Sequence, residues 1–138
     1  MEPCKQCRGV RGATVVTANT TESIVAACAE LFESMTRANG IQASDIAAMV
    51  FTATPDLGAA FPAQAARIAG FEAVPRICAQ EIDVPGGLAQ CLRILLLWNT
   101  DKQAGAVTHC YLNGAQALTM LDEQDPSLLD GLQKPFSG

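Results

Sequence analysis

The chain has 138 residues, a formal net charge of −5, 49% hydrophobic residues and only 17% charged residues. This length predicts one domain with a modest core, and the acidic balance argues against nucleic acid as the main partner. The longest apolar run, 94–98, is far too short to cross a bilayer, and the N-terminus lacks a targeting pattern, so we expect a cytoplasmic protein. The low charged fraction favours subunits that cover each other's surface over a compact, Ala-rich monomer.

The first half of the chain predicts a strand, a helix and a second strand. Residues 8–16 are typical of a strand, and a helix follows that Thr20 or Thr21 can cap. Asn39-Gly40 is a typical helix end, 44–45 a short turn, and 48–52 a buried strand. One face of the helix carries its apolar residues, which are Ile24, Val25, Cys28, Leu31, Phe32 and Met35.

The second half predicts further elements separated by Pro and Gly. We expect a helix from Pro62 to Gly70, strands at 74–79, 91–100 and 107–112, and a short helix or turn at 115–121. The 91–100 strand is apolar on both faces, which predicts a central strand covered on both sides. The acidic tail 122–138 is expected to be mobile. The pattern predicts a single α/β or α+β domain over 1–138, with about five strands and two or three helices.

Three charged residues stand in apolar surroundings. Arg93 shares a strand face with Cys91, Leu95 and Leu97, where an unpaired guanidinium would be costly to desolvate. A structural role, as a buried ion pair or at a strand end near solvent, explains Arg93 as well as an anion-binding role does. Arg11 lies near Gly9 and Gly12, which would let a ligand or another backbone approach, although an exposed arginine on an edge strand is the simpler interpretation.

The acidic residues Glu81 and Asp83 flank Ile82 and point the same way if the chain is extended there, so an arginine is their expected partner. Ordinary solvation in a loop is the alternative. Buried arginines, one glutamate and no acid–base pair suit an anionic ligand and a reaction helped by electrostatics.

The sequence lacks residues that other classes of catalytic site require. His109 is the only histidine and no nucleophile marks its surroundings, so a structural role is expected. Cys4-Lys5-Gln6-Cys7 is a single CxxC motif without the further ligands of a zinc site, and we interpret it as incidental. The six cysteines are expected to be free and mostly buried thiols. We predict no metal and no cofactor.

Several motifs together resemble the monofunctional AroH-type chorismate mutases over residues 8 to about 121. They are Arg8-Gly9-Val10-Arg11-Gly12-Ala13-Thr14, Thr52-Ala53-Thr54-Pro55-Asp56-Leu57, Phe61-Pro62-Ala63, Gln80-Glu81-Ile82-Asp83-Val84 and Gly86-Gly87-Leu88 with Cys91-Leu92-Arg93. The resemblance implies a homotrimer with a central pseudo-α/β-barrel and active sites in clefts between subunits. It also implies rearrangement of chorismate to prephenate, a step of aromatic amino-acid biosynthesis, without a cofactor.

The resemblance assigns site residues by position. Arg11 and Arg93 would bind the carboxylate and the ether oxygen, and Glu81 would hold the ring hydroxyl with help from the Cys78 backbone. Tyr111 would lie near the side-chain carboxylate, and Arg67 at the entrance. The apolar wall would be Phe61, Val74 and Leu118, and Ile77 replaces a family threonine that precedes the active-site cysteine, Cys78. Gln64 and Thr119 replace basic residues of the family, which weakens the positive rim but not the centre.

Two rival functions stay open on the sequence. A trimeric imine or enamine deaminase would share the overall architecture and an interfacial arginine. A non-catalytic trimer that binds a metabolite of the aromatic pathway would share the site but not the turnover. The paired arginines together with Glu81 favour the mutase.

Overall fold

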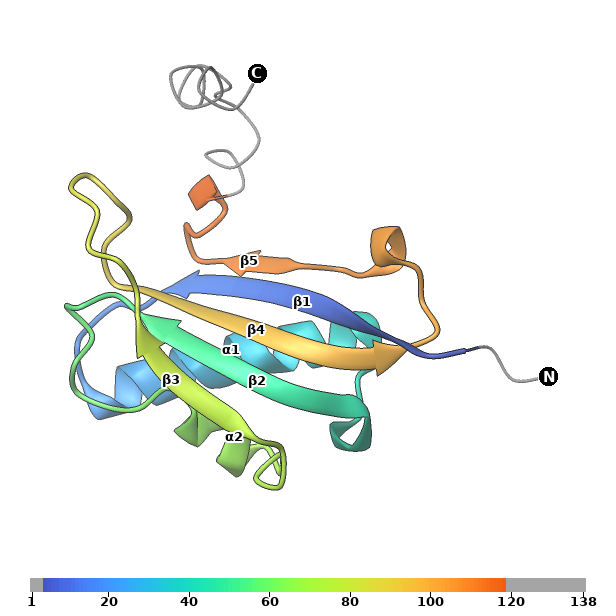
Figure 1. The fold of residues 1–138 in the computed structure, drawn as a ribbon. Helices are drawn as coiled ribbons and strands as arrows, with labels where there is room; N and C mark the ends of the chain where they lie inside the picture. Colours follow the sequence, from blue (N-terminus) through green and yellow to red (C-terminus); the bar gives the residue numbers. More distant parts are fainter. Residues whose placement is uncertain (1–3, 119–138) are drawn as a thin grey trace, which may run out of the picture.

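The computed structural model describes residues 4–118, which form one mixed sheet with two helices on one face (Figure 1). The strand order is β3-β2-β4-β1-β5; β4 is antiparallel to β1 and β2, whereas β5 is parallel to β1 and β3 to β2. The elements are β1 (Gln6–Val15), α1 (Thr21–Asn39), β2 (Ile46–Ala53), α2 (Gln64–Ile68), β3 (Arg76–Gln80), β4 (Cys91–Thr100) and β5 (Cys110–Leu112). The expected α/β class is confirmed. Within the described part of the chain, no helix is long and apolar enough for a membrane span.

Helix α1 begins and ends where the sequence predicts. The Thr20 hydroxyl accepts a hydrogen bond from the Ser23 amide at 3.1 Å, which satisfies one of the free donors at the helix start. At the other end Gly40 adopts the left-handed conformation, φ 69°, and its amide donates to a carbonyl of the last turn. The apolar stripe of α1, including Ile24, Leu31 and Phe32, is fully buried against the sheet.

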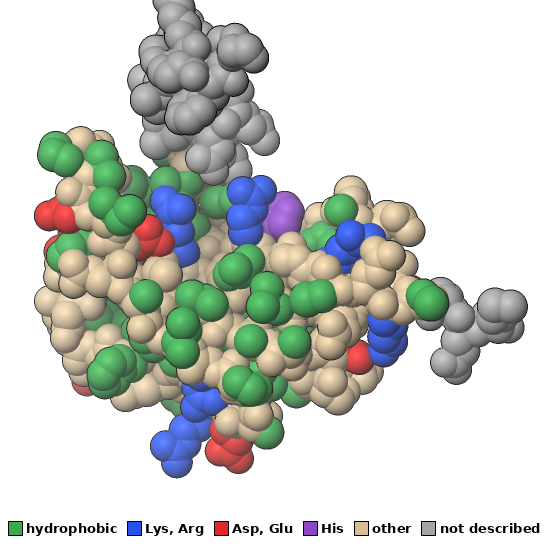
Figure 2. Space-filling model, viewed as in Figure 1, with side chains coloured by type: hydrophobic (Ala, Val, Ile, Leu, Met, Phe, Trp, Pro, Cys, Tyr) green, Lys and Arg blue, Asp and Glu red, His purple; other side chains and the backbone are tan. Residues whose placement is uncertain are grey.

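Within residues 4–118, the helices cover only one face of the sheet. Leu92, Ile94 and Leu96 of β4 point toward α1 and are buried, whereas the alternate residues lie on the opposite face, and Leu95 there is 36% exposed. We call this opposite face the open face; it faces the viewer in Figures 1 and 2. The prediction that β4 is covered on both sides is therefore wrong for one chain. Part of this face is covered over Ala13 and Cys91 by Ala115 and Leu118, against which Leu88 also packs.

Several element boundaries differ from the sequence prediction. Strand β2 is longer than 48–52, α2 is shorter than 62–70, and β3 begins at Arg76 rather than 74. Strand β5 begins at Cys110 rather than 107, because the buried side chain of Asn39 bonds to both backbone groups of Thr108, with the amide at 2.8 Å and the carbonyl at 2.9 Å. Those groups are thereby taken from strand pairing. In the predicted helix or turn at 115–121, Ala115 and Gln116 form a turn and Ala117 and Leu118 are helical; the predicted mobile tail lies outside the described residues.

The cysteines are free, as expected, but fewer are buried than predicted. Cys28 and Cys91 are buried and Cys110 is partly so, whereas Cys4, Cys7 and Cys78 are exposed. The exposed three lie at the start of β1 or on the edge strand β3, where no further layer covers the chain.

Gly12 is required by packing against α1. A Cβ atom at this position would lie 2.3 Å from the Met35 Sδ atom and 3.1 Å from Leu31 Cδ1, and both side chains are fully buried. The close approach that Gly12 permits is thus made by α1. We expect Gly12→Ala to reduce the free energy of unfolding by about 1–3 kcal/mol, measured by urea denaturation. Gly58→Ala is the control, because nothing lies within 4 Å of its Cβ position. Equal stability of the two variants would contradict this role.

Candidate active site

One row of paired residues crosses the open face and places the predicted charged residues together. Thr52 of β2 pairs with Arg93 of β4, Arg93 with Ala13 of β1, and Ala13 with Tyr111 of β5. Directly paired residues point to the same side of a sheet, so Arg93 and Tyr111 flank the small side chain of Ala13. Arg11 lies two residues before Ala13 on the same strand and therefore shares this face. Figure 2 shows basic side chains gathered beside the chain's one histidine at this end of the open face.

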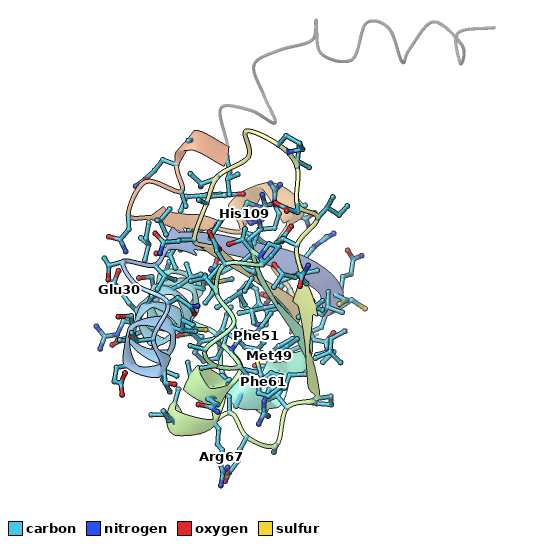
Figure 3. The ribbon with its side chains drawn as sticks, turned by 90° about the vertical axis from the view of Figure 1, so that its left-hand side faces the viewer. Glu30, Met49, Phe51, Phe61, Arg67 and His109 are labelled. Carbon is cyan, nitrogen blue, oxygen red and sulfur yellow. The ribbon has the colours of Figure 1, made fainter. Side chains whose placement is uncertain are left out.

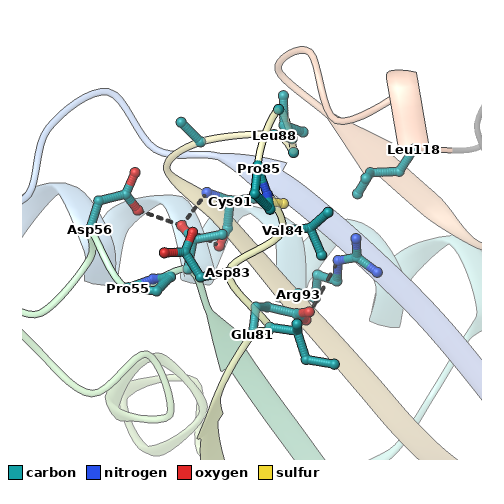
Figure 4. Close-up of a pocket in the computed structure, with 15 residues that line it drawn as sticks. Pro55, Asp56, Glu81, Asp83, Val84, Pro85, Leu88, Cys91, Arg93 and Leu118 are labelled. Atoms are coloured by element: carbon teal, nitrogen blue, oxygen red, sulfur yellow. Dashed lines mark hydrogen bonds and ion pairs between the residues drawn. The ribbon is translucent and has the colours of Figure 1, made fainter.

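Arg93 is held by a protein carboxylate. Its Nε atom lies 3.6 Å from Oε1 of Glu81, and the same oxygen accepts a hydrogen bond from the Thr52 hydroxyl (Figure 4). The side chains are 45% and 25% exposed, so Arg93 is not buried within one chain, contrary to the sequence prediction. Glu81 follows β3 directly, and its amide donates to the Ala53 carbonyl at 2.9 Å, which fixes its place beside β2. The predicted arginine partner of Glu81 is confirmed; for Asp83, no ion pair is seen among residues 4–118.

The single histidine supports the strand that carries Arg11. The Arg11 amide donates a 3.0 Å hydrogen bond to His109 Nδ1, just before β5 begins to pair with β1. Partial burial and the neighbouring Arg11 charge lower the pKa of His109 below its ordinary 6.5. The imidazole is then neutral at physiological pH, which leaves Nδ1 free to accept this bond. The structural role expected for His109 agrees with this contact.

The charged residues border a cavity of about 260 Å³ on the open face. A larger cavity of about 620 Å³ adjoins it beneath the loop 82–89 and shares Glu81, Arg93 and Leu118 with it (Figure 4). The smaller cavity is lined by Arg11, Gly12, Ala13, Val50, Thr52, Glu81, Arg93, Ile94, Leu95, Tyr111 and Leu118. We call it the arginine cavity. Two cations, one carboxylate, a phenol and an apolar wall fit a small anion that also carries a hydroxyl group.

Sequence reasoning overlooked the residues that fix the start of β4. The Asp56 carboxylate accepts hydrogen bonds from the Thr54 hydroxyl and, at 2.9 Å, from the amide of Gln90, which has a positive φ of 51°. These hydrogen bonds lower the pKa of the Asp56 carboxyl, and the bond from Thr54 has the largest effect. The Thr54 hydroxyl also accepts from the Cys91 amide at 3.0 Å. This network anchors the chain two residues before Arg93, and the motif Thr54-Pro55-Asp56 was its only sequence signal.

The other predicted site residues lie elsewhere in the chain. Phe61, Arg67, Ile77 and Cys78 line a separate groove of about 360 Å³ between α2 and the edge strand β3. We call it the edge groove. Figure 3 shows Arg67 at the opposite end of the molecule from His109, with Phe61 between them on the Arg67 side. The edge groove and the arginine cavity have no lining residue in common, although a cavity of about 460 Å³ shares Phe61 and Cys78 with the edge groove and Thr54 with the larger cavity.

Val74 belongs to neither cavity. It is only 6% exposed and is part of the hydrophobic core, so its predicted place in the apolar wall is not where the structure puts it. The physical reason is that β3 starts two residues later than predicted, so Val74 lies in the preceding turn and points inward. Arg76 lines the edge groove instead. Thr119, which replaces a basic residue of the family, lies outside the described residues.

No metal centre emerges between residues 4 and 118, where no three His, Cys, Asp or Glu side chains are grouped to hold an ion. Cys4 and Cys7 are both exposed free thiols at the far end of β1 from Ala13. The donor set at the arginine cavity is suited to binding an organic anion rather than a cation.

Comparison with known proteins agrees with this geometry. The family described as chorismate mutase type I matches residues 7–120. The chain is 48% identical over 112 residues to chorismate mutase AroH of Thermus thermophilus, covering 80% of this chain and 92% of that protein. It is 42% identical over 106 residues to chorismate mutase AroH of Bacillus subtilis, covering 76% and 84%. The solved structure of a Clostridium thermocellum chorismate mutase superposes with a TM-score of 0.78 at 46% identity, covering 79% of this chain and 97% of that one. The chain belongs to the chorismate mutase type I family.

Proposed function

We propose that this protein rearranges chorismate to prephenate at the arginine cavity. The activity is that of a chorismate mutase, an isomerase, and chorismate is the substrate class that its family implies. The observation that carries the proposal is the placement of Arg11, Arg93, Glu81 and Tyr111 around one cavity on the open face. Family membership favours this activity over a deaminase-like enzyme or a binding module without turnover.

The reaction requires positioning and charge stabilisation. One C–O bond of chorismate breaks and one C–C bond forms in the same molecule, so no proton has to be transferred. The enolpyruvyl arm must be held over the ring, which is an orientation problem that a rigid cavity can solve. Negative charge grows on the ether oxygen as the C–O bond lengthens, and a fixed cation facing that oxygen lowers the barrier.

We assign these tasks to the side chains of the arginine cavity. Arg93 bridges the side-chain carboxylate and the ether oxygen, while Arg11 and Tyr111 hold the carboxylate. Glu81 accepts a hydrogen bond from the ring hydroxyl. Among the described residues its contacts with Thr52 and Arg93 both use Oε1, which leaves the second oxygen directed to the ligand. Leu118 closes the apolar side of the cavity.

The proposal includes a homotrimer in which each site is shared between two subunits. Phe61, Ile77, Arg67 and the Cys78 backbone are the remaining predicted contacts, and they line the edge groove rather than the arginine cavity. A second copy that brings its edge groove to the open face of the first would complete the site. Exposed apolar side chains support such packing: Phe61 is 69% exposed, Ile77 63% and Leu95 36%. A cytoplasmic location is part of the same proposal.

We expect kcat to vary little between about pH 6.5 and 9 and chelators to have no effect. Burial raises the pKa of the Cys91 thiol, so it stays neutral there, and arginine side chains keep their charge. His109 has a lowered pKa, so the unfolded chain binds its proton more readily, and stability falls only as the pH drops through the folded value. Initial rates of chorismate loss across this range check the prediction. A bell-shaped kcat profile within it would indicate general acid–base chemistry and the deaminase-like alternative.

A further inference from the structure

A second arginine, Arg76, shares the edge groove with Arg67. The groove is lined by Phe61, Ala63, Gln64, Arg67, Arg76, Ile77 and Cys78, a set with two cations and no carboxylate. The charged side chains of the groove are therefore positive, in contrast to the whole chain, whose net charge is −5. A concave surface with only positive side chains attracts anions and raises their local concentration.

The guanidinium of Arg76 is held in place by the backbone. Its Nη1 atom donates to the Glu72 carbonyl at 3.1 Å and to the Val74 carbonyl at 3.3 Å, and the residue is only partly exposed. Between residues 4 and 118, no carboxylate lies within ion-pair distance of it. A guanidinium has five N–H donors, so donors remain for an anion after these two contacts. Since the side chain is already ordered, binding an anion costs little further conformational entropy.

Arg67 is less suited than Arg76 to bind an anion. Its side chain is 74% exposed, its Nε atom lies 3.9 Å from a Glu72 oxygen, and Figure 3 shows it pointing away from the protein. Glu72 partly offsets its charge, and a mobile exposed side chain must be ordered before it can hold a ligand. The fixed and unpaired charge of Arg76 is better placed to recognise a carboxylate.

Arg76 also lies beside the residues that the proposed function uses. It is two positions before Cys78 on β3, so both are on the same side of the strand and about 7 Å apart along it. Chorismate carries two carboxylates, and Arg11 and Arg93 account only for the one on the side chain. The carboxylate on the ring has no assigned cation. We infer that Arg76 binds the ring carboxylate from the subunit that contributes the edge groove, an assignment that rests on the proposed function.

The test compares charge removal with charge conservation. We expect Arg76→Gln to raise KM about tenfold, to leave kcat within about twofold, and to weaken the salt dependence of kcat/KM. Arg76→Lys keeps the charge and should stay within about threefold of the wild-type KM. Arg37→Gln is the matched control, since Arg37 lies on α1 in an exposed pair with Glu33. Thermal unfolding is measured for each variant, because the hydrogen bonds from Arg76 to the Glu72 and Val74 carbonyls can also stabilise the fold.

A binding measurement separates the ring carboxylate from the rest of the ligand. A bicyclic diacid analogue of the transition state is titrated against its monoester at the ring carboxylate. The wild type should bind the diacid about tenfold more tightly, and Arg76→Gln should bind both equally. If Arg76→Gln does not fold, the inference still requires that Arg76→Lys and Arg67→Gln bind the diacid more tightly than its monoester.

The outcomes distinguish this inference from the proposed function. An unchanged KM in Arg76→Gln, or an unchanged preference for the diacid, overturns the inference while wild-type turnover upholds the function. Equal losses in Arg76→Gln and Arg76→Lys with lowered thermal stability assign Arg76 to the fold alone. Wild-type protein that fails to convert chorismate overturns the proposed function, whatever the variants do.

Discussion

Replacing Arg93 with glutamine is expected to lower kcat by about 10² to 10³, or roughly 3–4 kcal/mol of transition-state stabilisation. In the proposed mechanism its charge faces an oxygen that becomes negative only on the way to the transition state, so we expect the loss to fall on kcat more than on KM. Glutamine keeps hydrogen bonding and some of the bulk. The measurement is steady-state turnover of chorismate by the variant after its assembly and thermal stability have been checked.

The ion pair with Glu81 sets the control for this experiment. If Arg93 served only to neutralise Glu81, the double variant Arg93→Gln/Glu81→Gln would regain both the stability and the kcat lost in the single variant. We expect stability to recover in part, because no unpaired carboxylate is left, while kcat stays low. A single variant with wild-type kcat, or a double variant with restored kcat, would make Arg93 a structural residue.

Replacing Leu97 with glutamate is expected to separate the subunits and abolish turnover. Leu97 is on the open face, where it is partly exposed, and it pairs with Gly9 and Ala48. A carboxylate buried there without a partner is strongly unfavourable. Three chains of 14.5 kDa give 43.5 kDa, so light scattering should show a change from 43.5 to 14.5 kDa. We expect kcat/KM to fall by more than about 10³, because in the proposed trimer the substrate is positioned by two subunits together.

The matched control places the same charge on the exposed surface of α1, on the side of the sheet opposite the open face. Ala26 is exposed on α1, and Ala26→Glu should remain a trimer with normal turnover. Circular dichroism shows whether the Leu97 variant is still folded. A folded 14.5 kDa protein with full activity would mean that one chain contains the whole site, and the shared-cleft proposal would be wrong.

The local structure could be predicted from the sequence wherever a short pattern determines it. The cap at Thr20, the left-handed Gly40 and the period-two alternation of β4 each depend on neighbouring residues. The same alternation correctly placed Arg93 on a face with Leu95. The burial of that face could not be predicted for one chain, because it depends on what packs against the sheet rather than on the strand itself.

The positions of the site residues in space depend on contacts between residues that are far apart in the sequence. Thr52, Arg93, Ala13 and Tyr111 come from four strands, and only the strand order places them in one row. The separation of the edge groove from the arginine cavity has the same origin, since β3 is at the edge of the sheet. The start of β3 was predicted two residues too early, because strand boundaries depend on pairing more than on composition. Val74, which the resemblance placed in the site, lies in the turn before this strand.

The most direct test of the account is the loss of chorismate absorbance with purified wild-type protein, with prephenate measured in the same samples. We expect saturable conversion of chorismate to an equal amount of prephenate, unaffected by EDTA. A bicyclic transition-state analogue should inhibit it and bind at least about 10²-fold more tightly than the substrate. Tight binding of the analogue without any conversion of chorismate would contradict the account and leave the protein a metabolite-binding module.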